Sequence, residues 1–199
     1  MTSLFVSRFT QVFGDMESTL PWHITEKLTD IIAGFIQQLD AGFEINGDIA
    51  IHQSAVIDQN VVIKGPAIVG RNVFIGANAY LRGPVYLDEN VKIGAGCEIK
   101  QSVIFSDTAV AHFNYIGNSV IGSRVNFEAG SVAANHYNER HDKHIIVLHD
   151  GKKIPTNVTK FGSLVGDDAK IGANAVLSPG TILPPKSVVA RLQLVNQLA

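Results

Sequence analysis

The chain has 199 residues, enough to bury the core of one domain with a small appendage. Its formal net charge is −2 at pH 7 and its isoelectric point is near 6.4, which gives no basic surface for nucleic acid or an anionic membrane. The single cysteine, Cys97, excludes an internal disulfide, and no apolar run reaches the roughly 18 residues that a transmembrane helix needs. We expect a cytoplasmic protein with neither a nucleic-acid nor a membrane partner.

The first recognisable element is a helix. From Trp22 to Leu39 the apolar residues recur every three or four positions, which is typical of one helical face. Pro21 suits the first turn of this helix, and the stretch before it carries no strong pattern. We predict an N-terminal helical segment over residues 1–46, packed beside or capping a main domain over residues 47–199.

The main domain begins with a six-residue repeat that is headed by an aliphatic residue. A 3.6-residue helix cannot hold a strict period of six on one face, whereas three short strands per 18-residue coil can. The aliphatic heads then stack into a central column, and neighbouring coils pair as parallel strands about 4.8 Å apart. The heads are Ile51, Ile57, Ile63, Val69, Ile75, Leu81, Leu87, Ile93 and Ile99, and later Val165, Ile171, Leu177, Leu183 and Val189.

The repeat is irregular in the middle of the chain. The hexads headed by Ile99 and Ile116 are one residue short, and the pattern disappears between about residues 135 and 160. That interval contains the strand-like IIVLH, a turn at Asp150-Gly151 and then KKIPT. We therefore predict an extruded loop that carries a small hairpin.

Two cations stand at the coil period. Arg82 and Lys100 each follow a hexad head and are 18 residues apart, so they are expected to lie one above the other; Lys64 extends the series. Stacked cations repel each other unless an anion lies between them, and a guanidinium beside an ammonium suits phosphate. The series indicates either a phosphate site or a solvated charged face.

A histidine, a tyrosine and two asparagines gather around the short hexads. His112 is a candidate proton acceptor, because histidine side chains ordinarily titrate near neutral pH, although lone histidines are more often structural. Tyr115, Asn126 and Asn135 offer hydroxyl and amide groups that can hold sugar hydroxyls. Asparagines also satisfy backbone groups at turns, which is an equally good explanation for each of them alone.

Four further histidines raise the question of zinc. They are His136, His141, His144 and His149. Counting two 18-residue coils back from His136 gives Lys100, and a lysine there would remove the third ligand and put a positive charge at the metal position. The histidines more readily decorate a polar loop, and we expect no metal.

The repeat and the sequence HFNYIG from His112 resemble the hexapeptide-repeat acyltransferases, in particular the glucosamine-1-phosphate N-acetyltransferase domain of the bifunctional enzyme that makes UDP-N-acetylglucosamine. The second motif of that family is similar to VNFEAG from Val125, and its following asparagine to Asn135. The resemblance covers residues 51–195 and implies an all-β fold, a left-handed parallel β-helix. The hand of the coil comes from the resemblance alone.

The resemblance also implies transfer of acetyl from acetyl-CoA to an amino-sugar 1-phosphate, without a metal, in a homotrimer that shares its sites between subunits. In that scheme His112 is the base. The implied substrate ligands are Arg82, Lys100 and Tyr115 for the phosphate, with Asn126 and Asn135 for the sugar. Small residues at Ala129, Ala173 and Ala190 would admit the pantetheine arm of the donor.

The chain departs from the family pattern at two places. Glu128 replaces a glycine beside the expected thioester path, and the family's loop lysine has no unique counterpart, with Arg140 and Lys143 both possible. No glycine-rich phosphate loop precedes the repeat, so uridylyl transfer is not expected. Two other functions stay open. One is a non-catalytic sugar-phosphate sensor or scaffold related to sugar nucleotidyltransferases, and the other is an acyltransferase for a nucleotide-linked amino sugar.

Overall fold

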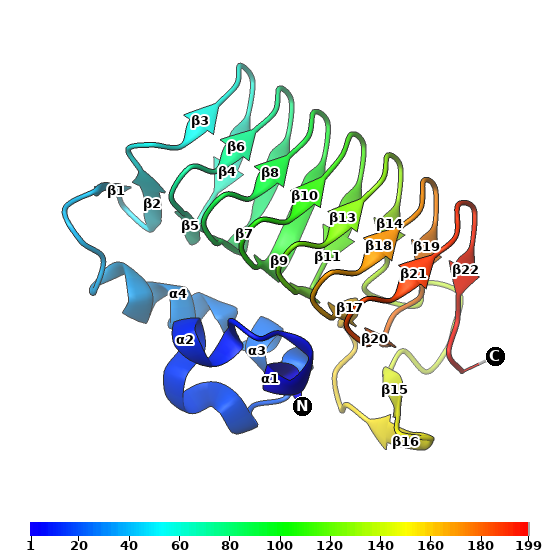
Figure 1. Cartoon of the computed structure of the whole chain (residues 1–199). Helices are drawn as coiled ribbons and strands as arrows, with labels where there is room; N and C mark the ends of the chain where they lie inside the picture. Colours follow the sequence, from blue (N-terminus) through cyan, green and yellow to red (C-terminus); the bar gives the residue numbers. More distant parts are fainter. Residues whose placement is uncertain (199) are drawn as a thin grey trace.

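The computed structural model describes residues 1–198, apart from the side chains of Asp15 and Glu17. Its larger part is a left-handed parallel β-helix, and a group of short helices lies against one side of the coil (Figure 1). The predicted all-β coil is therefore confirmed, including its hand. No helix among the described residues is both long and apolar enough to cross a membrane.

The coil has three faces. The first face is a sheet of seven parallel strands: β3 (Val56–Ile57), β6 (Phe74–Ile75), β8 (Lys92–Ile93), β10 (Ala109–Val110), β13 (Asn126–Phe127), β18 (Lys170–Ile171) and β21 (Val188–Val189). The second face contains β4 (Val62–Lys64), β11 (Tyr115–Gly117), β14 (Val132–Ala133), β19 (Val176–Leu177) and β22 (Leu194–Val195). The third face contains β2 (Ile49–His52), β5 (Ala67–Val69), β12 (Val120–Ile121), β17 (Ser163–Val165) and β20 (Thr181–Leu183). Strands β7 (Tyr80–Leu87) and β9 (Glu98–Ile104) turn the corner and join the second face to the third.

The aliphatic heads fill the inside of the coil, as the period predicts. Leu81, Ile99 and Ile116 are fully buried in one continuous core, and the resumed repeat adds Val165 and Ile171 after the interruption. Parallel strands pair along all three faces, so each head lies over the head of the coil before it. The core is thus a single column, and every outward side chain has a fixed position on a face.

The third face is buried on its outer side as well. Its outward residues Ile68, Val103 and Leu164 form a second apolar cluster with Phe9 and Trp22 of the helical segment. A Trp or Phe deleted from such a cluster typically costs about 3–5 kcal/mol. Within residues 1–198, no helix lies against the first or the second face (Figure 1).

The helical segment differs from the prediction. The predicted helix from Trp22 to Leu39 is two helices, which break at Lys27 and end at Ile36. The stretch before them, which showed no strong pattern, is also helical, because the β-helix supplies the apolar surface that short helices need. The elements are α1 (Thr2–Phe5), α2 (Phe9–Phe13), the 3₁₀ helix η1 (Gly14–Ser18), α3 (Pro21–Glu26) and α4 (Leu28–Ile36), followed by β1 (Phe43–Asn46), which pairs antiparallel with β2. The division at residues 46 and 47 stays a prediction, since helices and coil share one apolar cluster.

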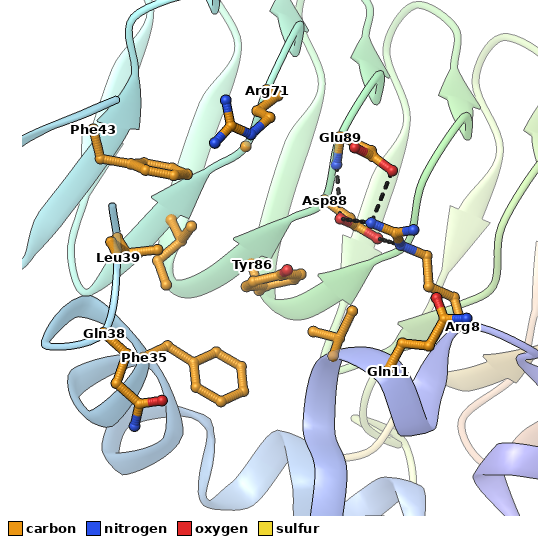
Figure 2. A pocket seen from close by; sticks show the side chains of 13 residues that line it. Arg8, Gln11, Phe35, Gln38, Leu39, Phe43, Arg71, Tyr86, Asp88 and Glu89 are labelled. Carbon is orange, nitrogen blue, oxygen red and sulfur yellow. Dashed lines mark hydrogen bonds and ion pairs between the residues drawn. The ribbon is translucent and has the colours of Figure 1, made fainter. Parts of the chain in front are cut away.

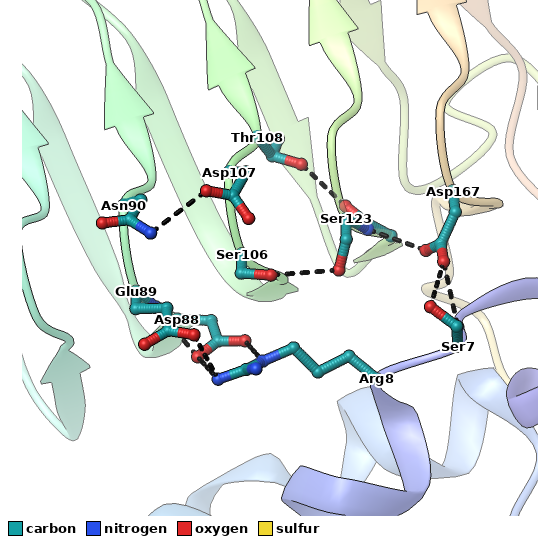
Figure 3. Close-up of polar contacts among 11 residues, drawn as sticks. Ser7, Arg8, Asp88, Glu89, Asn90, Ser106, Asp107, Thr108, Ser123 and Asp167 are labelled. Carbon is teal, nitrogen blue, oxygen red and sulfur yellow. Dashed lines mark hydrogen bonds and ion pairs between the residues drawn. The ribbon is translucent and has the colours of Figure 1, made fainter.

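Polar contacts fix the helical segment to the coil (Figure 3). Arg8 Nε lies 2.6 Å from Asp88 Oδ2, and Arg8 Nη2 lies 2.8 Å from Glu89 Oε1. The hydroxyl of Ser7 donates to Asp167 Oδ2 at 2.6 Å, and the same carboxylate accepts the N–H of Ser123 at 2.8 Å. Three carboxylates of the coil therefore hold the start of the chain in register.

A hollow of about 350 Å³ remains between the helical segment and the coil (Figure 2). The rings of Phe35 and Tyr86 meet edge to face at its apolar side, with centroids 6.1 Å apart, and Arg71 lies at its polar side. Burial raises the pKa of Tyr86. The guanidinium of Arg71 already contacts Asp40 and His52.

The predicted extruded loop is confirmed. Strands β15 (Ile146–His149) and β16 (Lys152–Pro155) form an antiparallel hairpin around Asp150 and Gly151, both of which have positive φ. The loop folds back on the coil, where the hydroxyl of Tyr137 donates to the carbonyl of Pro179 at 3.0 Å. It therefore covers the same third face as the helices.

Candidate active site

The predicted series of cations is present. Lys64 pairs in register with Arg82, and Arg82 with Lys100, on the second face of the coil. Arg82 also contacts Glu98, with Nη1 3.1 Å from Oε1. That contact joins two partly exposed side chains, so a phosphate can compete for the guanidinium.

Lys100 has a different environment from Arg82. It forms no ion pair with any residue whose side chain the structure describes, and its pKa is lowered from 10.5 by burial first, then by the charges of Lys160 and Arg82. Lys160 stands at the end of the extruded loop and is not among the predicted site residues, for which Arg140 and Lys143 were the two candidates for the loop cation. Three positive groups thus gather at one corner of the coil, which favours binding of an anion.

Gly117 lies in register with Lys100 and brings two predicted ligands together. A Cβ atom on Gly117 would lie 2.6 Å from Tyr115 Oη and 2.9 Å from Asn135 Cγ, so only glycine lets the phenol and the amide approach. Asn135 is buried and donates from Nδ2 to Asn118 Oδ1 at 2.6 Å. Burial raises the pKa of Tyr115, and Glu98 raises it further, so the phenol stays a hydrogen-bond donor at neutral pH.

A polar hollow of about 360 Å³ lies beside this corner. It is lined by Gln101 and Asn118 of the coil, by Lys160 of the loop and by Glu26 of α3. Gln101 Nε2 donates to the carbonyl of Thr25 at 3.0 Å, which ties the helix to the coil here. The helical segment therefore forms one wall beside the cations, a role that periodicity along the chain did not reveal.

His112 stands at the opposite end of β11, in the corner that follows β10. It is exposed, and its carbonyl accepts the N–H of Gly130 of the next coil at 2.9 Å. Asn114 is buried and donates to the carbonyls of Ala111 and His112, while Phe113 takes a positive φ of 57°. The corner is thus held rigidly, and the imidazole stays open to solvent.

Asn126 and Asn135 lie on different faces within one chain. Asn126 is exposed on β13 of the first face, whereas Asn135 follows β14 on the second. The chain therefore separates Asn126 from the cluster of Arg82, Lys100, Tyr115 and Asn135. One chain does not bring all the predicted ligands into a single pocket.

The predicted donor path runs along the corner that carries Ala129, Ala173 and Ala190. The N–H of Asn174 donates to the carbonyl of Ala129 at 3.0 Å, so the coils are stacked here as expected. Glu128 does not point away from the path. Its carboxylate accepts the N–H of Ala173 at 2.8 Å and two hydrogen bonds from Arg191.

The count used against a zinc site is wrong by two residues. Ile99, Ile116 and Ala133 lie in register on successive coils, 17 residues apart, because two hexads are short. His136 therefore does not stand over Lys100, and the lysine carries no argument about a metal. Among the described residues, no group of three or more His, Cys, Asp or Glu side chains is placed to hold a metal ion.

This geometry defines a class: a hexapeptide-repeat left-handed β-helix, here with three cationic side chains gathered at one corner. Two family models match the sequence accordingly. The bacterial transferase hexapeptide model, of six repeats, matches residues 48–83, and the GMPPB C-terminal domain model matches residues 83–197. The chain belongs to the GMPPB C-terminal domain family.

Named relatives point the same way. The chain is 35% identical over 181 residues to the bifunctional protein GlmU of Methanococcus maripaludis. This alignment covers 89% of this chain and 43% of the relative. It is 37% identical over 84 residues to a bifunctional sugar-1-phosphate nucleotidylyltransferase/acetyltransferase of Sulfurisphaera tokodaii, covering 42% of this chain and 20% of the relative. The chain thus spans less than half the length of these curated relatives. The resemblance to the C-terminal part of GlmU is confirmed.

The solved structures found are more distant. A hexapeptide transferase family protein from Anaplasma phagocytophilum is 19% identical, with a TM-score of 0.44, and the match covers 70% of this chain and 72% of that one.

Proposed function

We propose that the protein is an N-acetyltransferase that moves acetyl from acetyl-CoA to an amino-sugar 1-phosphate, glucosamine or galactosamine 1-phosphate, in the synthesis of UDP-N-acetylhexosamines. The observation that carries this proposal is the corner where Arg82 and Lys160 lie near Lys100, while the phenol of Tyr115 and the amide of Asn135 lie beside Gly117, the residue in register with Lys100. In this proposal the cations and the phenol of Tyr115 bind the phosphate, and the amide of Asn135 holds the sugar.

The reaction needs only a base, an oxyanion site and a leaving thiolate. The imidazole of His112 takes a proton from the substrate ammonium, and the amine nitrogen attacks the thioester carbonyl carbon. Backbone N–H groups near Ala129 stabilise the oxyanion, and the C–S bond then breaks. The imidazolium returns its proton to the CoA thiolate, and the attacking nitrogen loses its second proton to water, so the ammonium and the thioester give the amide, the CoA thiol and one released proton, without a metal.

A homotrimer completes the site in this proposal. The third face is covered by the chain's own helices, while Val62 and Leu194 are exposed on the second face and Phe74 and Val188 on the first. A neighbouring subunit packed on these faces would bury them and bring Asn126 of one chain to the Asn135 corner of another. A cytoplasmic setting, with no nucleic-acid or membrane partner, belongs to the same proposal.

The test is thiol release from acetyl-CoA in the presence of glucosamine 1-phosphate and, side by side, galactosamine 1-phosphate. Release must require the sugar phosphate. His112→Ala should lower kcat by about 10²- to 10⁴-fold, whereas His141→Ala, in the exposed loop, should not change it. Unaltered turnover in His112→Ala would remove His112 as the base.

A second function is favoured by Glu128, whose carboxylate lies on the donor path. The chain would then be a sugar-phosphate sensor or scaffold without acyl transfer. Calorimetry separates the two: binding of the sugar phosphate without measurable binding of CoA supports the sensor.

A further inference from the structure

A groove of about 400 Å³ runs across the last coils on the first face. It is lined by Asn126, Glu128, Lys170, Gly172, Ala190 and Arg191. Gly172 lets the next coil stack closely here, because a Cβ there would lie 2.5 Å from the backbone nitrogen of Arg191. Since Ala190 lines the groove, the groove adjoins one of the positions expected to admit the acyl donor.

The charges of the groove are arranged around Glu128. Arg191 Nε lies 2.7 Å from Glu128 Oε2, and Arg191 Nη2 lies 2.9 Å from Oε1, so the pair is bidentate. The same Oε2 accepts the N–H of Ala173 at 2.8 Å. Without the carboxylate, the groove would offer one free backbone donor and two cations, Arg191 and Lys170.

These free groups match an acyl donor of the pantetheine phosphate type. A backbone N–H binds an amide carbonyl of the pantetheine arm, and a guanidinium beside an ammonium binds its phosphates. A carboxylate that accepts from both the N–H and the guanidinium occupies the positions that the carbonyl and the phosphate need.

We propose that Glu128 sets the affinity for the acyl donor: its carboxylate holds Arg191 and the Ala173 N–H in the donor-free chain, and the phosphate-bearing donor must displace it from both. Lys170 is the second cation for the donor phosphates. This inference rests on the proposed acyl transfer and concerns its donor half only.

The ion pair between Glu128 and Arg191 can be broken by a competing anion. The side chain of Arg191 is 73% exposed, so water and salt screen its attraction to Glu128. Acid cannot open it in the usual range, because the hydrogen bonds from Arg191 and Ala173 lower the pKa of Glu128 from 4.5 to about 2. Substitution is therefore the way to neutralise Glu128.

The probe is CoA, with affinity measured by calorimetry on the full chain. Glu128→Gln should raise the affinity for CoA about threefold, because Arg191 is released. Glu128→Gly should raise this affinity about tenfold, because the Ala173 N–H is released as well. Arg191→Ala and Lys170→Ala should each weaken CoA. Lys92→Ala is the control for lysine, since Lys92 lies in the same row of the first face outside the groove.

The matched control for the pair is Asp168. It forms the same bidentate contact, with Arg124 Nε at 2.7 Å and Nη2 at 3.0 Å, away from the donor groove. Asp168→Asn should leave CoA affinity unchanged. Unchanged or weaker CoA binding in both Glu128 variants overturns the inference.

The outcome is separable from the proposed function. If only the Glu128 variants bind CoA, the inference stands, and acyl transfer by the natural chain falls. If the natural chain binds CoA as tightly as the variants, the inference falls, and thiol release still tests the transferase.

Discussion

The two ends of strand β11 meet the two expected substrates in opposite ways. At the end of Gly117, Lys100 has no ion-pair partner with a described side chain, and Tyr115 and Asn135 meet across a glycine. At the end of His112, the nearby donor groove satisfies its own charges through Glu128 and Arg191. The first end keeps one cation without an ion pair to a described side chain, beside the partly exposed Arg82–Glu98 contact, whereas in the donor groove Glu128 and Arg191 are paired with each other. Preorganisation of this kind favours the sugar phosphate over the acyl donor.

Loss of Lys100 should disturb the phosphate end most. Lys100→Ala removes the cation at the centre of the cluster, and a hydrogen bond to a charged group is typically worth about 1.5–3 kcal/mol, so sugar-phosphate affinity should fall about 10- to 100-fold. Calorimetry with glucosamine 1-phosphate measures the change. Lys92→Ala removes a lysine from the uncovered first face and should have no effect. Equal affinity in Lys100→Ala would place the phosphate elsewhere.

A smaller loss should follow from Gly117→Ala. The new methyl group would lie 2.6 Å from Tyr115 Oη, so the phenol and the Asn135 amide must move apart. We expect the affinity for the sugar phosphate to fall about tenfold, while circular dichroism shows that the coil is intact. Gly34→Ala is the control, because open space surrounds that position on α4 and alanine favours a helix. If Gly117→Ala binds the sugar phosphate with unchanged affinity, the phenol of Tyr115 and the amide of Asn135 do not act on one ligand.

The coil was predictable because its period fixes the register. A repeat of 18 residues places Arg82 over Lys100 whatever the rest of the chain does, and the structure pairs them. Packing of the helical segment beside or at the end of the coil was predicted, but the face that it covers was not, although apolar pairs such as Ile68-Val69 and Val103-Ile104 mark a sheet that is buried on both sides.

The rest of the site depends on contacts that spacing does not encode. Lys160 reaches Lys100 only because the extruded loop folds back, and Arg191 reaches Glu128 across 63 residues that include that loop. The two short hexads also shift the count, which is why His136 was assigned to the wrong column. The two short hexads thus cause a larger error in the predicted register than the length of the repeat does.

The smallest expected effect is the change of stability and of sugar-phosphate affinity with pH that Lys100 causes, and these two changes have opposite signs. Its pKa is lowered from 10.5, mainly by burial, so the lysine loses its proton at a lower pH in the folded chain than in the unfolded chain. Between the two pKa values the unfolded chain binds more protons, and the contribution of Lys100 to the free energy of unfolding therefore rises with pH. Binding of the sugar phosphate should weaken over the same window, because the cation disappears. Stability and affinity should thus move in opposite directions.

The variant Lys100→Arg isolates the contribution of Lys100, because arginine stays charged over this range. Denaturant unfolding and calorimetry from pH 8 to 10.5 measure the difference between the natural chain and this variant. Parallel pH profiles in the two proteins would mean that another lysine carries the effect.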